Sequence, residues 1–267
     1  MGTRVRLGLA ALDRYLARQD EDGAVRSARR CFAGVWLIYD VVDTLAGGVE
    51  HARNWMPHPA SATLFATHAV LVLCGIQLVR DRLPFALGLT AAAARLVETS
   101  QYGLNDFYYY GLMMLLMAHG DGGPWEKGKR PLWVRHALLA QLGWMYLATA
   151  VLKLNVDWLG GGQLFVRTEY LVRAFDWPYP RFAHDAFQSM RVCSILAYLA
   201  VIGELLLAVV LLARGPYWLG VVLVATIHLF AIVVTNVWFF SVSNIVVVAL
   251  LLPRPGGRRY PSSISMA

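Results

Sequence analysis

Charged residues are scarce in this sequence. Of its 267 residues, only 15% are Asp, Glu, Lys or Arg, whereas 58% are hydrophobic. A soluble domain carries roughly a quarter of charged residues, because its outer surface faces water. The shortage of charge therefore excludes an ordinary soluble domain. It predicts a chain whose outer surface faces lipid and that has no room for a large soluble domain.

The motifs of several common chemistries are also missing. The three cysteines, Cys31, Cys74 and Cys193, are widely spaced and match neither a disulfide framework nor a metal site, so we expect small interior residues. No two histidines stand three or four residues apart, and there is no His-Glu helix motif. A glycine-rich phosphate loop and a serine elbow are absent as well. Metal, nucleotide and acyl-transfer chemistry therefore have no support.

The charge that is present is mostly positive, with a net value of +7. Basic residues gather beside the apolar runs, as in Arg26, Arg29 and Arg30 and again in Arg258 and Arg259. Flanking positive charge of this kind orients membrane helices. We therefore expect a lipid membrane as the partner and no nucleic acid.

Long apolar runs dominate the chain and predict an all-α, polytopic transmembrane bundle of about eight spans. The final two runs share one stretch that is too long for a single crossing, so we expect two helices joined near Asn236. We divide the chain into a cytoplasmic segment 1–30, a transmembrane domain 31–252 and a disordered cytoplasmic tail 253–267. The apolar runs lie near 31–48, 60–80, 83–100, 104–119, 132–154, 192–213, 217–235 and 237–252.

The loop charges predict the orientation of these spans in the cell membrane. If the basic N-terminus is cytoplasmic, then Arg80, Lys127 and Arg214 all fall in cytoplasmic loops, as the positive-inside bias requires. Both termini are then cytoplasmic. The segment 155–191 lies on the outer side, where its three consecutive glycines favour a hinge followed by an interfacial helix, with an ordinary surface loop as the alternative.

Ionisable and amide residues inside the apolar runs are the candidate functional residues, because charge at membrane depth is costly and usually faces the bundle interior. The depths at which these residues lie in the predicted spans indicate a polar cavity that opens toward the outer face. Ordinary pairing is the alternative: Arg95 could pair with Glu98, Lys153 could pair with Asp157, and His228 could be a hydrogen-bonded interior histidine. The set comprises Asp40, Asp43, His68, Gln77, Arg95, Glu98, Asn105, Asp106, Lys153, Glu204, His228, Asn236 and Asn244.

One stretch carries a family resemblance. Residues 131–162 read PLWVRHALLAQLGWMYLATAVLKLNVDWLGGG. This stretch resembles the vitamin K-dependent gamma-carboxylase and its bacterial relatives, the horizontally transferred transmembrane (HTTM) domain family. A glutamate in one later span and a histidine in the next are similar to the family as well. The matching residues are Pro131, Leu132, Trp133, Gln141, Tyr146, Lys153, Leu154, Asp157 and Trp158.

The resemblance implies a membrane enzyme that uses a reduced quinone (menaquinone or vitamin K type), molecular oxygen and, where carboxylation occurs, CO2. Lys153 takes the position of the carboxylase's catalytic lysine, which deprotonates the reduced quinone. An apolar pocket would favour the neutral, basic form of such an amine. Asp106 stands where the carboxylase has a functional histidine, and the sequence shows no counterpart of its large C-terminal lumenal domain. The resemblance therefore implies quinol oxidation more strongly than carboxylation of a glutamate.

The predicted depth of these residues in the membrane and the resemblance to the HTTM family together select the residues of the candidate site. The candidate catalytic residues are Lys153, Asp106 and His228; the cofactor-binding residues are Asn105, Tyr146, Trp158 and Arg95; the substrate-pocket residues are Asp40, Glu98 and Glu204. The substrate would be a peptide or a small molecule at the outer face. Two other functions stay open: a non-redox maturation protein for a secreted peptide, of the sporulation-delaying-peptide type, and a structural or transport bundle.

Overall fold

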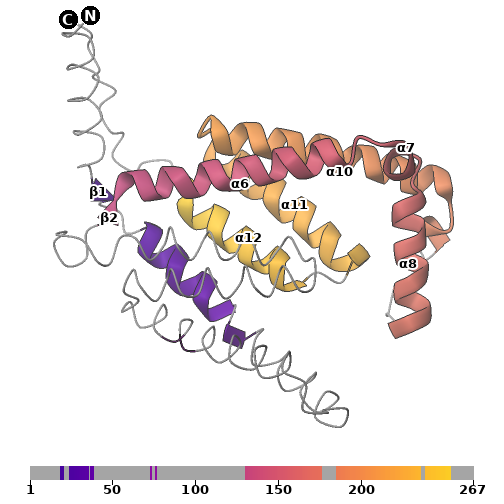
Figure 1. Ribbon diagram of the computed structural model, residues 1–267, viewed down its shortest axis with the longest axis horizontal. Helices are drawn as coiled ribbons and strands as arrows, with labels where there is room; N and C mark the ends of the chain where they lie inside the picture. Colours follow the sequence, from indigo (N-terminus) through magenta and orange to yellow (C-terminus); the bar gives the residue numbers. More distant parts are fainter. Residues whose placement is uncertain are drawn as a thin grey trace, which may run out of the picture. The chain divides into compact units, whose positions relative to one another are not determined.

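The computed structural model describes residues 19–20, 24–35, 37–38, 73, 76, 130–175, 185–235 and 238–253. Apart from short turns, these residues are helical, except for an antiparallel pair of two-residue strands, β1 (Gln19–Asp20) and β2 (Arg130–Pro131). The all-α class is therefore confirmed (Figure 1). The predicted residues Asp40, Glu98, Arg95, Asn105 and Asp106 lie outside the described residues.

The helices follow the predicted apolar runs closely. They are α6 (Leu132–Leu152), α10 (Met190–Leu212), α11 (Tyr217–Thr235) and α12 (Trp238–Leu251). Helix α11 ends at Thr235 and α12 begins at Trp238, on either side of the predicted break near Asn236, which itself lies outside the described residues. An earlier helix covers 24–35, so helical structure begins inside the segment 1–30 that we assigned to the cytoplasm.

The contacts divide the chain into two compact units. The first contains Met1–Leu138 and His228–Leu250, and the second contains Leu139–Ile227 and Leu251–Ala267. In the first unit, the helix over 24–35 buries one face through Val25, Ala28 and Phe32, which recur at helical spacing.

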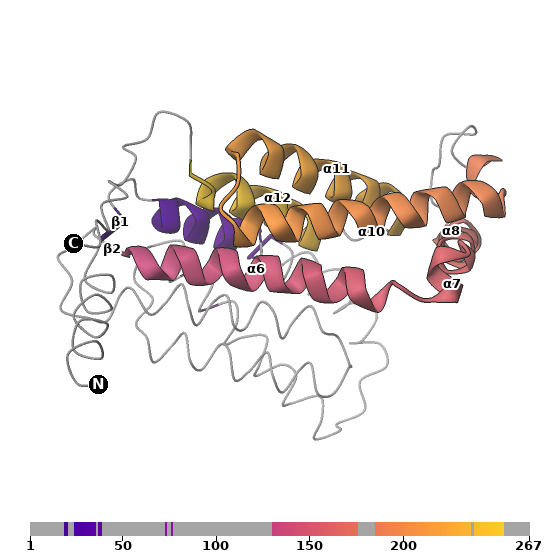
Figure 2. The same cartoon turned by 90° about the horizontal axis from the view of Figure 1, so that it is seen from above.

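The second unit holds α6 from Leu139, the short α7 (Val156–Leu159), α8 (Gly162–Phe175), α10 and the first part of α11. Figures 1 and 2 show α6 and α10 running side by side, with α8 crossing their direction. Gly143 permits the close approach, because a Cβ atom there would lie 2.7 Å from Leu212 Cγ. The helix that we predicted after the glycine hinge is present as α8, whereas its interfacial position stays a prediction.

The length and hydropathy of the described helices decide which of them could cross a membrane. Of the residues that the structure describes, only α10, with 23 residues, forms a helix both long and apolar enough to cross a membrane. The apolar stretches Tyr217–Val233 and Ser241–Leu251 are shorter. A single helix of this kind also occurs as the core of a soluble protein. The arrangement of about eight spans therefore stays a prediction.

Candidate functional site

The end of α6 and the start of α7 are joined through Asn155. Its backbone is extended (φ −134°), and its Oδ1 accepts a hydrogen bond of 2.9 Å from the Trp158 amide, which caps α7. Its Nδ2 donates a bond of 2.8 Å to the Leu152 carbonyl at the end of α6. One asparagine thus satisfies backbone groups of both helices, and it fixes where Lys153 and Trp158 stand.

The turn after α7 rests directly on the beginning of α10. Gly161 has a positive φ of 84°, and a Cβ atom there would lie 2.6 Å from the Ser194 backbone nitrogen. Only glycine combines this backbone conformation with such a close approach. The Ser194 hydroxyl also donates a 2.6 Å hydrogen bond to the Leu159 carbonyl. These two contacts hold α7, and with it Trp158, against α10.

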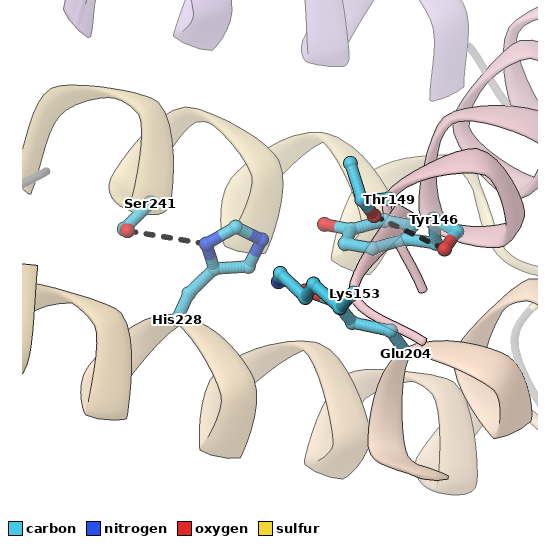
Figure 3. A network of polar contacts seen from close by, with 6 residues as sticks. All are labelled: Tyr146, Thr149, Lys153, Glu204, His228 and Ser241. Atoms are coloured by element: carbon cyan, nitrogen blue, oxygen red, sulfur yellow. Dashed lines mark hydrogen bonds and ion pairs between the residues drawn. The ribbon is translucent and has the colours of Figure 1, made fainter. Parts of the chain in front are cut away.

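Lys153 and Glu204 form an ion pair between the end of α6 and the middle of α10 (Figure 3). The side chain of Glu204 is only 8% exposed, and that of Lys153 is 25% exposed. The Lys153 Nζ atom also lies 4.9 Å from the centre of the Trp158 ring, within cation–π range. The three residues form what we call the Lys153 cluster: Lys153, Glu204 and Trp158.

Two polar atoms of the Lys153 cluster have hydrogen-bonding capacity to spare. Glu204 Oε2 and Trp158 Nε1 are both buried, and neither has a hydrogen-bond partner within the part of the chain that the structure describes. Buried polar atoms are nearly always satisfied, since an unmade hydrogen bond is costly. An acceptor oxygen and a donor N–H thus remain without partners on the two residues that contact the Lys153 ammonium group.

This arrangement can hold a proton in either of two places. With the proton on nitrogen, the pair is an ammonium and a carboxylate; with the proton on oxygen, it is a neutral amine and a carboxylic acid. The amine has a free lone pair only in the second form. Lys153 and Glu204 together can therefore accept a proton from a bound group and pass it on, which is general acid–base chemistry.

A second polar pair lies in the other unit. His228, in α11, is buried with 3% of its surface exposed, and its Nδ1 lies 3.1 Å from the hydroxyl oxygen of Ser241, in α12. Figure 3 draws this bond as a dashed line. A buried histidine that is hydrogen-bonded to a serine matches the structural alternative considered for His228. Its proposed catalytic role stays a prediction.

The predicted site is recovered in part. Lys153, Trp158 and Glu204 meet in the Lys153 cluster, where Lys153 pairs with Glu204 rather than with Asp157. Tyr146 is buried in α6, and its backbone carbonyl accepts a 3.1 Å hydrogen bond from Thr149.

The structure also separates the cysteines and adds contacts that were not predicted. Cys193 is buried as expected, but Cys31 is exposed, so the interior assignment is wrong for that residue because its side chain lies off the buried face of its helix.

Sequence reasoning did not single out Ser194 or Ser241. Their positions within apolar helices are the only signal that could have drawn attention to them.

Comparison with known proteins adds no identification, since no family model, no curated protein and no solved structure matches the chain. The likeness to the HTTM family therefore rests on the residues quoted above.

Proposed function

We propose that this protein is an HTTM-like, multi-pass membrane enzyme in which the Lys153 cluster performs acid–base chemistry on a reduced quinone in the presence of oxygen. The product would be a modified peptide or small molecule at the outer face. The observation that carries the proposal is the part-buried Lys153–Glu204 pair, in which one carboxylate oxygen has no hydrogen-bond partner among the described residues.

The surface of α10 supports a lipid environment. Glu204 lies on the buried face of α10, whereas the exposed face is mainly apolar after Arg191 in the first turn. Leaving so many large apolar side chains in water would be unfavourable, by roughly 25 cal/mol for each Å². Hydrocarbon removes this cost. The exposed residues are Met190, Ile195, Tyr198, Leu199, Ile202, Leu206, Val209 and Leu212.

The helix α8 supports an interfacial position at one end of the spans. It crosses the direction of α6 and α10 (Figure 1), and it exposes Val166 and Arg167 while burying Leu164 and Thr168. A helix that presents both apolar and basic side chains beside a spanning helix suits the membrane–water boundary.

The residues of the Lys153 cluster fit a reduced quinone. A quinol carries hydroxyl groups, and the open Glu204 Oε2 and Trp158 Nε1 atoms would accept from and donate to such a group. When bound, the quinol supplies the electrons that reduce oxygen. Lys153, with its proton held on Glu204, would accept the hydroxyl proton.

A structural or transport bundle is the second candidate, because an ion pair is also what simple stabilisation of two helices would produce. The two functions differ in what they require of Lys153. A structural pair needs a cation, whereas the enzyme needs a group that can give up its proton.

The substitution Lys153→Arg separates these requirements, since arginine keeps its charge and is not a base in proteins. Membranes containing the protein are incubated with reduced menaquinone under oxygen, and the epoxide is measured by mass spectrometry. We expect Lys153→Arg to lower epoxide formation by at least about 100-fold, whereas Arg214→Lys, in the exposed turn after α10, leaves it unchanged. Equal turnover in Lys153→Arg would refute the role of Lys153 as base, and no epoxide from the unaltered protein would refute the redox function.

A further inference from the structure

The turn that joins α10 to α11 carries an isolated charge. Arg214 is the only Asp, Glu, Lys or Arg residue in the sequence between Glu204 and Arg254. It is exposed, and its side chain forms no ion pair or hydrogen bond with any residue that the structure describes. The turn lies at the end of α10, the described helix that could cross a membrane (Figure 2). A guanidinium group without a described anionic partner therefore stands at the end of this helix.

The backbone of Arg214 has a conformation that favours glycine. Its φ is 53°, and no other non-glycine residue in the described ranges has a positive φ. Main-chain bonds alone close α10 here: the Gly215 amide donates to the Val210 carbonyl at 2.7 Å, and the Arg214 amide donates to the Leu211 carbonyl at 3.3 Å. Glycine at this position would make the same two bonds without strain. The arginine side chain is therefore not needed to end the helix.

Two aromatic residues follow Arg214 at the start of α11. The ring centres of Tyr217 and Trp218 lie 5.0 Å apart, and the rings meet edge to face at 75°. Trp218 is 66% exposed. The two helices pack closely beside the turn, since a Cβ atom at Gly220 would lie 3.2 Å from Val210 Cγ1. Tyrosine and tryptophan at the end of a spanning helix are typical of the lipid head-group region.

We propose that Arg214 and Trp218 bind the head-group region of an anionic phospholipid. The guanidinium group pairs with the lipid phosphate, because its planar set of N–H donors matches phosphate oxygens. The exposed indole of Trp218 lies against the glycerol region, where its N–H can donate to an ester oxygen. The strain at Arg214 is tolerated because glycine would remove the phosphate contact.

The charges around the turn favour an anionic lipid over a zwitterionic one. No acidic residue occurs from 205 to 253 to repel a phosphate. Phosphatidylcholine carries its own cation beside the phosphate and gains less from a guanidinium group than phosphatidylglycerol does. The predicted orientation places this turn at the cytoplasmic surface, where anionic lipids attract basic residues.

Because the lipid site rests on the membrane location proposed above but not on the quinol chemistry, it is tested with lipids alone. The full-length protein, labelled with fluorotryptophan, is placed in phosphatidylcholine nanodiscs, and the fluorine NMR resonance of Trp218 is assigned by its loss in Trp218→Phe. Trace phosphatidylglycerol or phosphatidylcholine, each with a nitroxide beside the glycerol, is then added. We expect phosphatidylglycerol to broaden this resonance about 5-fold more than phosphatidylcholine does, and we expect the preference to fall as salt is raised.

Variants of Arg214 separate its charge from its backbone strain. Arg214→Gln should abolish the preference for phosphatidylglycerol, whereas Arg214→Lys, which keeps the charge, should retain most of it. Arg214→Gly should also abolish the preference, but it should raise the SDS fraction needed for unfolding, because glycine relieves the positive φ. The matched control is Arg191→Gln, which removes an equal charge from the exposed first turn of α10 and should leave the preference unchanged.

Equal broadening by the two lipids in the unaltered protein would overturn the lipid site. An equal loss of preference in Arg191→Gln and Arg214→Gln would do so too, because net charge would then attract the lipid. Inorganic phosphate that abolishes the preference, where chloride at the same ionic strength does not, would replace the lipid with a soluble anion. Broadening by neither lipid would refute the membrane location as well. A lipid preference without quinol epoxidation would refute the redox proposal alone.

Discussion

Two buried polar pairs, each within one unit of this protein, differ in how completely they are satisfied. His228 and Ser241 are buried and joined by a hydrogen bond of 3.1 Å. Lys153 and Glu204 are charged, the lysine is partly exposed, and one carboxylate oxygen stays open. A hydrogen bond between a histidine and a serine is enough to join two helices, whereas a carboxylate oxygen without a partner can still bind another group. The comparison favours Lys153 and Glu204 as the candidate site and leaves the catalytic role of His228 a prediction.

The largest expected effect comes from breaking the charged pair. Lys153→Met leaves the buried Glu204 carboxylate without its cation, which should cost about 3 kcal/mol of unfolding free energy. The double substitution Lys153→Met/Glu204→Gln removes both charges and should recover most of that loss. Denaturation with SDS in detergent micelles measures both values. If the double variant is as unstable as the single one, the cost does not come from an uncompensated charge.

A smaller loss should follow from Gly161→Ala, which disturbs the frame that holds Trp158. The new Cβ atom would meet the Ser194 backbone nitrogen at 2.6 Å from a residue whose φ is 84°. We expect the unfolding free energy to fall by about 2 kcal/mol in the same SDS denaturation assay. The control is Gly203→Ala in α10, where a Cβ atom would make only an ordinary 3.4 Å contact with Ile227. Similar losses in both variants would argue against a special role for the α7–α10 turn.

The smallest effect is expected at the His228–Ser241 pair. Ser241→Ala removes one hydroxyl from His228 and should cost about 1 kcal/mol, with no loss of quinol turnover. The same SDS denaturation and epoxide assays apply. A loss of turnover comparable to that of Lys153→Arg would show that the second pair belongs to the chemistry, and the contrast between the two pairs would fail.

The sequence predicted the described helices well because their physical signals are local. Long apolar runs interrupted by Gly, Pro or Asn leave few choices for the ends, and α11 occupies the predicted 217–235. Three consecutive glycines likewise predicted a hinge before α8. Which glycine adopts the positive φ depends on its closeness to Ser194, a contact between residues far apart in the chain.

The candidate site was harder to predict, because its central contact is not local. Glu204 stands 51 residues from Lys153, and its partner depends on how α6 and α10 are rotated about their axes. Sequence spacing offered Asp157 instead, one helical turn away. The open atoms of Glu204 and Trp158 also emerge only from the packing, since a sequence shows which groups are polar but not which remain unsatisfied.

Epoxide formation by the double variant Lys153→Met/Glu204→Gln tests the central claim most directly. This variant keeps the site free of uncompensated charge but removes the base and the carboxylate oxygen. Assayed in membranes with reduced menaquinone and oxygen, it should stay folded and form epoxide at no more than about one hundredth of the unaltered rate. A folded double variant that forms epoxide at the unaltered rate would contradict the account, because the pair would then be structural.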